Sequence, residues 1–119
     1  MKKIIVSADC RGDFEFLFKK VEALHAKNRF DFLLCVGEVL GHGVSSALNQ
    51  LLDGKISVPL PTYFIEAGEM ASTLGCLYPE GKELTKNFTY LGRAGVKIIA
   101  GTKVAYLSGI QPPDHKLYE

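Results

Sequence analysis

Short apolar runs flank a longer amphipathic segment in the first third of the chain. The runs Ile4–Ser7 and Phe32–Val36 are uninterrupted and rich in β-branched or large apolar side chains, which is typical of buried strands. Between them, apolar residues recur at helical spacing. The pattern predicts a strand, a helix and a parallel strand, and the lack of polar alternation predicts that both faces of the sheet are covered.

The helix has recognisable ends. Asp13 is expected to be its N-cap, and Glu15 suits the positive end of the helix dipole and can pair with Lys19. Lys27 and Asn28 mark the predicted end, where Asn28 can adopt a left-handed conformation. The residues expected on the buried face are Phe14, Leu17, Phe18, Val21 and Leu24, with Phe16 off this stripe.

The middle of the chain carries weaker signals. Residues 45–52 can form a short helix that ends near Gly54, and Thr62–Ile65 has the composition of a third strand. The prolines between these two segments favour an extended connection. Residues 70–86 are expected to be loop with one helical turn.

The sequence pattern after residue 88 predicts β structure. A short strand is expected at 89–91, followed by two strands at 96–100 and 103–108. Gly101 and Thr102 separate the last two strands, and a two-residue spacing that contains glycine predicts a β-hairpin. The fold class is therefore α/β, with a βαβ start, parallel strands and a C-terminal β-hairpin.

The chain has 119 residues, of which 47% are hydrophobic and 23% charged, a balance typical of one folded domain. We expect residues 1–109 to form that domain and residues 110–119 to be a tail. No apolar stretch reaches the roughly 18 residues of a membrane span, and the N-terminal run is too short for a signal-peptide core. These features predict a protein that is neither a membrane protein nor secreted.

Charge and cysteine content narrow the function classes. The net charge is +1, with 14 basic and 13 acidic side chains scattered along the chain, which argues against strong nonspecific nucleic-acid binding but leaves room for a local patch. The three cysteines, Cys10, Cys35 and Cys76, are odd in number and widely spaced. They suit a reducing compartment, and none forms a CxxC metal motif.

Acidic residues follow each of the first three predicted strands. Asp9, Glu38 and Glu69 would meet at the carboxyl edge of a parallel sheet, which is where ligands bind in open α/β folds. Such an oxygen-rich cluster suits Mg²⁺ or Mn²⁺. The alternative is that these acids only cap turns and helices, and spacing alone leaves both interpretations open.

Five landmarks in the chain point to a known family. They are the stretches DCRGDF (9–14), LLCVGE (33–38), PTYFI (61–65), NFTYLGRAGV (87–96) and AYLSG (105–109). This series closely resembles the N-terminal domain of the CwfJ family, splicing-associated relatives of the lariat debranching enzyme, and the resemblance runs from about Lys3 to Gly109. It implies part of a calcineurin-like metallophosphoesterase sandwich.

The resemblance also implies where the metal ligands of active members would stand. Asp9 matches the first metal-binding Asp, whereas Arg11 replaces a His ligand and Glu38 replaces the bridging Asp. Glu69 stands in place of the Asn ligand and Met70 in place of the catalytic His. The later histidine motifs have no counterpart.

These departures predict the loss of the two-metal centre. Arg11 would repel a metal ion, and Met70 can neither donate a proton nor stabilise phosphate. We therefore expect no catalytic residue and no cofactor, although Asp9, Glu38, Glu69 and His42 leave room for one weakly held Mg²⁺ or Mn²⁺. Arg11 is expected to pair with Asp9, Glu38 or Glu69, and its fork could instead bind a phosphate group at this site.

Three function hypotheses follow. The first is a non-catalytic metallophosphoesterase-like domain in pre-mRNA splicing and lariat intron turnover, which binds a splicing protein or RNA phosphate. The resemblance implies a nuclear location, and otherwise a cytoplasmic one. The second is a metal-dependent phosphodiesterase with an altered ligand set, and the third is a scaffold without ligand. Because the chain resembles the first half of a larger sandwich, an exposed sheet edge could also support self-association.

Four other side chains have an expected role. His25 is expected to be a partly buried spacer on the helix. Cys10 is either a small buried side chain or, beside Arg11, a thiol with a lowered pKa. Gly92–Gly95 is expected to be a turn into the hairpin, where Arg93 and Tyr90 could form part of a partner surface.

Overall fold

The computed structural model describes residues 2–41 and 46–109, and its centre is a five-stranded sheet. The first four strands along the sheet are parallel, and the last pairs antiparallel with its neighbour. The predicted parallel βαβ unit is confirmed. In sheet order, the strands are β1 (Ile4–Ala8), β2 (Phe32–Val36), β3 (Thr62–Phe64), β5 (Phe88–Tyr90) and β4 (Lys82–Thr85).

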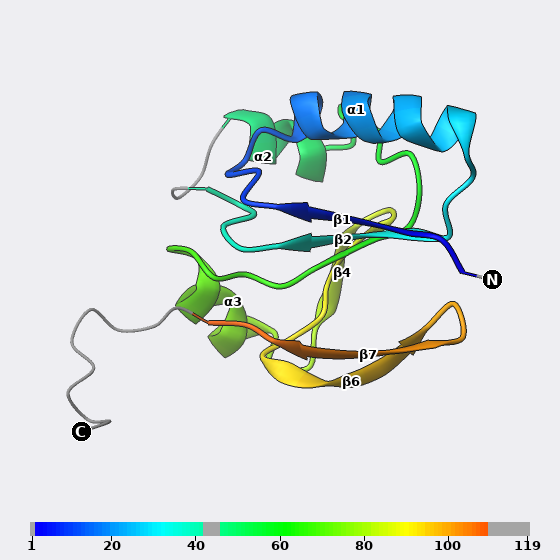
Figure 1. Ribbon diagram of the computed structural model, residues 1–119. Helices are drawn as coiled ribbons and strands as arrows, with labels where there is room; N and C mark the ends of the chain where they lie inside the picture. The colour runs from blue at the N-terminus through cyan, green and yellow to red at the C-terminus, as the bar shows by residue number, and fades with distance from the viewer. Residues whose placement is uncertain (1, 42–45, 110–119) are drawn as a thin grey trace, which may run out of the picture.

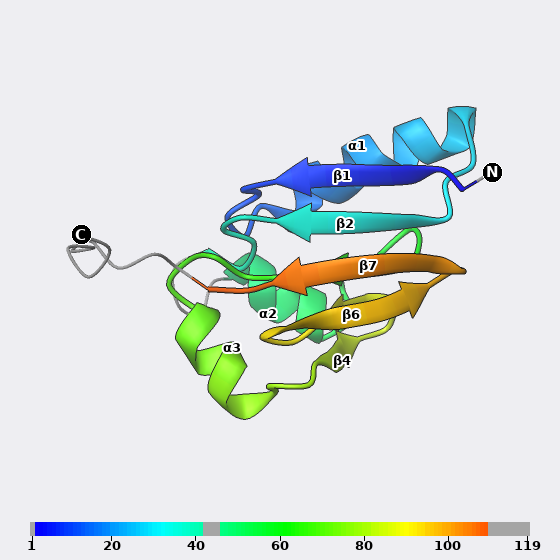
Figure 2. The same ribbon diagram turned by 60° about the horizontal axis from the view of Figure 1, so that its bottom comes forward.

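The sheet carries helices on one face and a hairpin on the other (Figures 1 and 2). Helices α1 (Phe14–Lys27) and α2 (Ser46–Leu52) cover the first face. The antiparallel pair β6 (Ala94–Ile99) and β7 (Thr102–Leu107) lies against the second. The short helix α3 (Ala71–Leu77) lies near the end of this hairpin. The architecture is a partial α/β sandwich, and the predicted C-terminal hairpin is confirmed.

The core between α1 and the sheet is aromatic. The Phe88 ring stacks on Phe64 with 4.7 Å between centroids and meets Phe14 edge-on at 5.6 Å. All three side chains are fully buried. The buried face of α1 is the predicted one except for Leu24, which is 49% exposed. The last turns of α1 extend past the strands it covers, so periodicity alone overstated the length of the buried stripe.

The ends of α1 are largely as predicted. The backbone N–H of Phe16 donates to Asp13 Oδ1 at 3.4 Å, and Lys19 Nζ lies 3.8 Å from Glu15 Oε1. The expectation for Asn28 is wrong, because this residue is extended, with φ −140°. Its N–H donates to the Leu24 carbonyl and closes the last turn without a left-handed residue.

The first two parallel strands, β1 and β2, differ in burial. In β2, Phe32, Leu33 and Cys35 are buried, as predicted for a strand covered on both faces. In β1 the same prediction is wrong, since Val6 is 63% exposed. The cause is position: β1 is an edge strand, and the hairpin covers the middle of the sheet instead of this edge.

The region 70–86 is more regular than expected. It contains the helix α3 and the edge strand β4. The sequence did not reveal β4, because this strand is only four residues long and has a register irregularity between Glu83 and Thr85. The hairpin turn is also shifted by one residue. Ala100 and Gly101 form it, with φ of 50° and 81°, as a two-residue turn with left-handed residues requires. No helix in the described part of the chain is long and apolar enough to cross a membrane.

Candidate functional site

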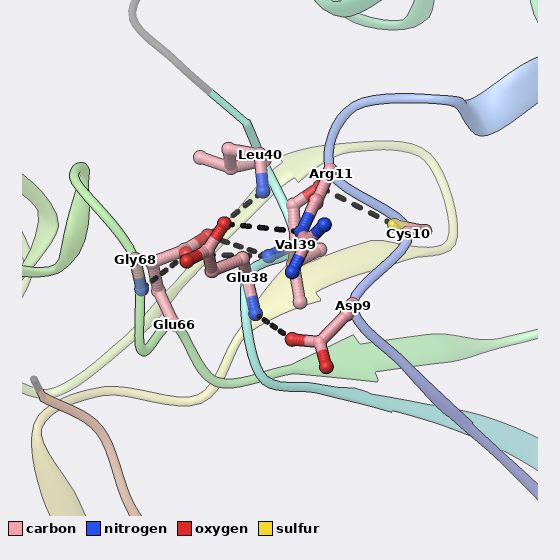
Figure 3. Close-up of polar contacts among 8 residues, drawn as sticks. All are labelled: Asp9, Cys10, Arg11, Glu38, Val39, Leu40, Glu66 and Gly68. Atoms are coloured by element: carbon pink, nitrogen blue, oxygen red, sulfur yellow. Dashed lines mark hydrogen bonds and ion pairs between the residues drawn. The ribbon is translucent and has the colours of Figure 1, made fainter.

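Three loops meet beyond the carboxyl ends of the neighbouring strands β1, β2 and β3 (Figure 3). They contain Asp9–Arg11, Glu38–Leu40 and Glu66–Gly68. Backbone hydrogen bonds continue from the paired strands β1 and β2 into the first two loops. The Asp9 N–H donates to the Val36 carbonyl, and the Gly12 N–H donates to the Val39 carbonyl. The edge of the sheet where a ligand is expected in this topology is thus tightly organised.

Arg11 and Glu38 are joined twice. Arg11 Nε lies 3.2 Å from Glu38 Oε2, and the Arg11 backbone N–H donates to the Glu38 carbonyl at 2.8 Å. The Glu38 N–H in turn donates to Asp9 Oδ1 at 2.8 Å. The structure therefore brings three of the predicted site residues together, with Arg11 paired to Glu38 among the acids it was expected to meet.

The backbone of the first loop is strained. Asp9 and Arg11 have φ of 53° and 50°, a left-handed conformation that costs a residue with a Cβ about 1–3 kcal/mol. Gly37 opposite them has φ 77°, and a Cβ at this position would overlap the Asp9 carboxylate. The hydrogen bonds to the second loop hold this conformation, which presents the Asp9 and Arg11 side chains at the site.

A buried carboxylate, Glu66, lies beneath this cluster. Its side chain is fully buried and accepts hydrogen bonds from three backbone N–H groups, those of Val39, Leu40 and Gly68. The shortest of these bonds, from Leu40 and Gly68, are both 2.8 Å. Figure 3 shows the carboxylate pointing at these backbone nitrogens from the loop that follows β3. Glu66 thereby fastens the second loop to the third.

Sequence reasoning missed Glu66 because it considered only the more distant acid, Glu69. In the structure Thr62, Phe64 and Glu66 are all buried, but the sequence TYFIE (62–66) has no alternation of polar and apolar residues that would show it. Burial raises the pKa of Glu66, and the nearby Glu38 charge acts in the same direction, while the three N–H donors oppose both.

The remaining predicted residues are Glu69, Met70 and His42. The Glu69 side chain is exposed, and Met70 is half-buried just before α3, where it gives no side-chain cap. His42 lies outside the described residues. Among residues 2–41 and 46–109, no three His, Cys, Asp or Glu side chains are grouped as they would be to hold a metal ion.

The cysteine beside Arg11 is held in the structure as a packed side chain. The Cys10 thiol donates to the Val39 carbonyl at 3.3 Å, and burial raises its pKa. The alternative of a thiol whose pKa is lowered by Arg11 is therefore wrong, since desolvation raises the pKa and Arg11 is not among the groups that shift it. His25 is half-buried as expected, and its Nδ1 accepts the Phe30 N–H at 3.0 Å.

The fold is an α/β sheet with acidic loops at the carboxyl edge of its parallel strands, and known proteins resemble the chain over most of its length. Human CWF19-like protein 1 is 32% identical over 111 residues, and the Drosophila melanogaster homolog of that protein is 35% identical over 112 residues. Each match covers 92% of this chain. The lariat debranching enzyme of Saccharomyces cerevisiae is more distant, at 27% identity over 128 residues, which covers 91% of this chain and 30% of the yeast protein.

The chain is similar to CWF19-like proteins over 92% of its length, which confirms the resemblance to the CwfJ family. It spans about a fifth of the length of these relatives, 21% in both cases. No family model matches the chain.

Proposed function

We propose that this chain is a phosphoesterase-like interaction module in RNA processing, acting in pre-mRNA splicing and lariat intron turnover without hydrolysing a phosphodiester. Kinship with CWF19-like proteins and with a lariat debranching enzyme supports the process. A nuclear location follows from the same proposal.

The ion pair of Arg11 with Glu38 carries the non-catalytic part of the proposal. Two positions that the family resemblance assigns to metal ligands are here occupied by a cation and its partner carboxylate, 3.2 Å apart. A divalent ion between Asp9 and Glu38 would have to displace the guanidinium or tolerate its repulsion. Arg11 thus neutralises the acids that a metal would otherwise neutralise, and we expect no bound metal.

An apolar face on the hairpin supports a protein partner. In the register of β6 and β7, alternate residues share the face turned away from the sheet, and all but one of them are apolar: Ala94, Val96, Ile98, Lys103, Ala105 and Leu107. Val96, Ile98 and Leu107 are 64%, 70% and 74% exposed. Large apolar side chains gathered on adjacent strands are typical of protein-binding surfaces. The whole chain has a net charge of only +1, so its surface offers little attraction for RNA phosphate. The apolar face therefore favours a protein partner over RNA.

The enzymatic test is Mn²⁺-dependent hydrolysis of a generic phosphodiester such as bis(p-nitrophenyl) phosphate. We expect no turnover above buffer with metal, and no difference between the wild type and Asp9→Ala. Turnover that Asp9→Ala abolishes would overturn the proposal. It would favour instead a phosphodiesterase with the ligand set Asp9, Glu38, Glu69 and His42.

The partner test uses the chain as bait in a splicing-competent nuclear extract, with the bound proteins identified by mass spectrometry. We expect the wild type to recover RNA-processing proteins and Ile98→Lys to lose them, because a second cation on this face, beside Lys103, opposes its burial. Val6→Lys is the matched control, since it places the same charge on an exposed residue of β1, outside this face. Equal recovery by Ile98→Lys, or RNase-sensitive recovery, would contradict the protein-partner proposal.

A further inference from the structure

A cavity lies between α3, the end of β5 and the hairpin, and it shares no residue with the Arg11–Glu38 site. Its volume is about 340 Å³, within the range of small-molecule sites. The lining residues with polar or reactive groups are Ser72, Cys76, Tyr90, Arg93 and Ser108. Among the described residues, none of the lining side chains is a carboxylate.

Arg93 is an exposed residue at the edge of this cavity, and it packs against α3. Its alkyl chain lies on Gly75 of α3, so closely that a Cβ there would be 3.2 Å from Arg93 Cγ. Its backbone is also held, because its N–H donates to Pro79 and its carbonyl accepts from Ser108. Its guanidinium, however, forms no ion pair within the part of the chain that the structure describes. A preformed cation without a counter-charge therefore lines the cavity.

Tyr90 provides an independent sign of a missing partner. The residue is fully buried and lines the same cavity, and its hydroxyl has no hydrogen-bond partner among the described residues. Buried hydroxyl groups in native proteins are nearly always hydrogen-bonded, so an unpartnered one needs an explanation. An oxygen atom of a molecule held in the cavity would supply the missing acceptor.

We propose that this cavity binds a small phosphorylated ligand, with Arg93 and the Tyr90 hydroxyl as donors to the phosphate oxygens. The guanidinium fork matches two oxygens of a phosphate group, and the hydroxyl of Tyr90 donates to a third. The Ser72 hydroxyl at the edge of the cavity is a further donor. The volume is large enough for a nucleoside monophosphate. The proposal is independent of the Arg11–Glu38 site and of the function assigned to it.

Titration calorimetry with inorganic phosphate, adenosine monophosphate and adenosine tests the ligand class. We expect the first two to bind and adenosine not to bind, because the recognised group is the phosphate. A parallel readout is alkylation of Cys76, an exposed thiol of the cavity wall, which bound phosphate should slow. Failure of the wild type to bind either phosphate compound would overturn the proposal.

Two variants separate a binding role from a structural one. Arg93→Gln should weaken binding more than about 10-fold, because charge-assisted bonds to phosphate are the stronger ones. Tyr90→Phe should weaken it about 5-fold, while leaving the unfolding temperature unchanged or raised, since the hydroxyl it removes has no partner in the protein. If Tyr90→Phe instead lowers the unfolding temperature and leaves affinity unchanged, the hydroxyl is structural and the proposal is wrong.

Two arginine controls locate the bound phosphate. Arg29→Gln makes the same charge change on an exposed residue outside both sites and should leave the affinity unchanged. Arg11→Gln should also leave it unchanged. Loss of binding in Arg11→Gln, with Arg93→Gln unaffected, would place the phosphate at the Arg11–Glu38 site and overturn the present assignment without bearing on whether that site is catalytic.

Discussion

Replacing Glu66 by alanine is expected to destabilise the protein by about 3 kcal/mol, because each buried polar group that loses its partner costs about 1–3 kcal/mol. The carboxylate accepts from the N–H groups of Val39, Leu40 and Gly68, and its removal leaves these buried donors without an acceptor. It also separates the two loops that carry Glu38 and Gly68. The loss should therefore reach the site as well as the fold.

Urea unfolding at neutral pH and thermal unfolding measure this effect, with an expected fall in the unfolding temperature of roughly 10 °C. Glu22→Ala is the matched control: it makes the same substitution on the exposed face of α1 and should change the free energy of unfolding by less than about 0.5 kcal/mol. Similar losses of unfolding free energy in the two variants would show that the hydrogen bonds of Glu66 do not hold the loops together.

The same carboxylate gives the stability a defined pH dependence. Because burial raises the pKa of folded Glu66 above its unfolded value of 4.5, the folded state binds the proton more tightly. The resulting stabilisation is fully present below pH 4.5 and is lost as pH rises through the folded-state pKa. The difference in unfolding free energy between wild type and Glu66→Gln, which cannot titrate, should therefore fall as pH rises across this window.

Strong local patterns predicted the fold where tertiary structure agreed with them. The apolar runs of β1 and β2 and the helical stripe of α1 are long or continuous enough to determine element type, and their parallel pairing follows from the connecting helix. The errors have a common physical origin. The exposure of Val6 and Leu24 depends on how far the hairpin and α1 extend over the sheet, and the short strand β4 is defined by its pairing with β5. Both are tertiary properties that periodicity does not contain.

The candidate site was predictable in composition but not in connectivity. The rule that ligand loops meet at the carboxyl ends of parallel strands predicted that Asp9, Glu38 and Glu69 converge, and the structure joins the first two by a hydrogen bond. Arg11, which the family resemblance placed at this site, pairs with Glu38. The partner of each could not be read from sequence, because it depends on left-handed backbone at Asp9 and Arg11. Glu66 escaped notice for a related reason: three backbone N–H groups bind it, and backbone donors leave no trace in residue identity.

The largest loss of stability is expected from Phe88→Ala, at about 3–5 kcal/mol, the usual range for truncating a buried phenylalanine. Phe88 is fully buried in the middle of the aromatic core. Its ring contacts Phe14 and Phe18 from α1 and Phe64 from β3, so its removal opens a cavity that three other rings cannot fill together. For a domain of this size the loss is comparable to the whole free energy of unfolding.

Phe16→Ala is the matched control for this prediction. Phe16 is in the same helix as two of the contacting rings but is 61% exposed, and its ring meets only the Lys20 ammonium at 5.7 Å in the aromatic contacts of the described chain. It should cost less than about 1 kcal/mol, because little area is removed from water. Circular dichroism with urea titration compares the two variants directly. If Phe88→Ala unfolds no more easily than Phe16→Ala, the β5 strand does not hold α1 against the sheet, and the loops beyond β1 and β3 must be positioned by their own hydrogen bonds alone.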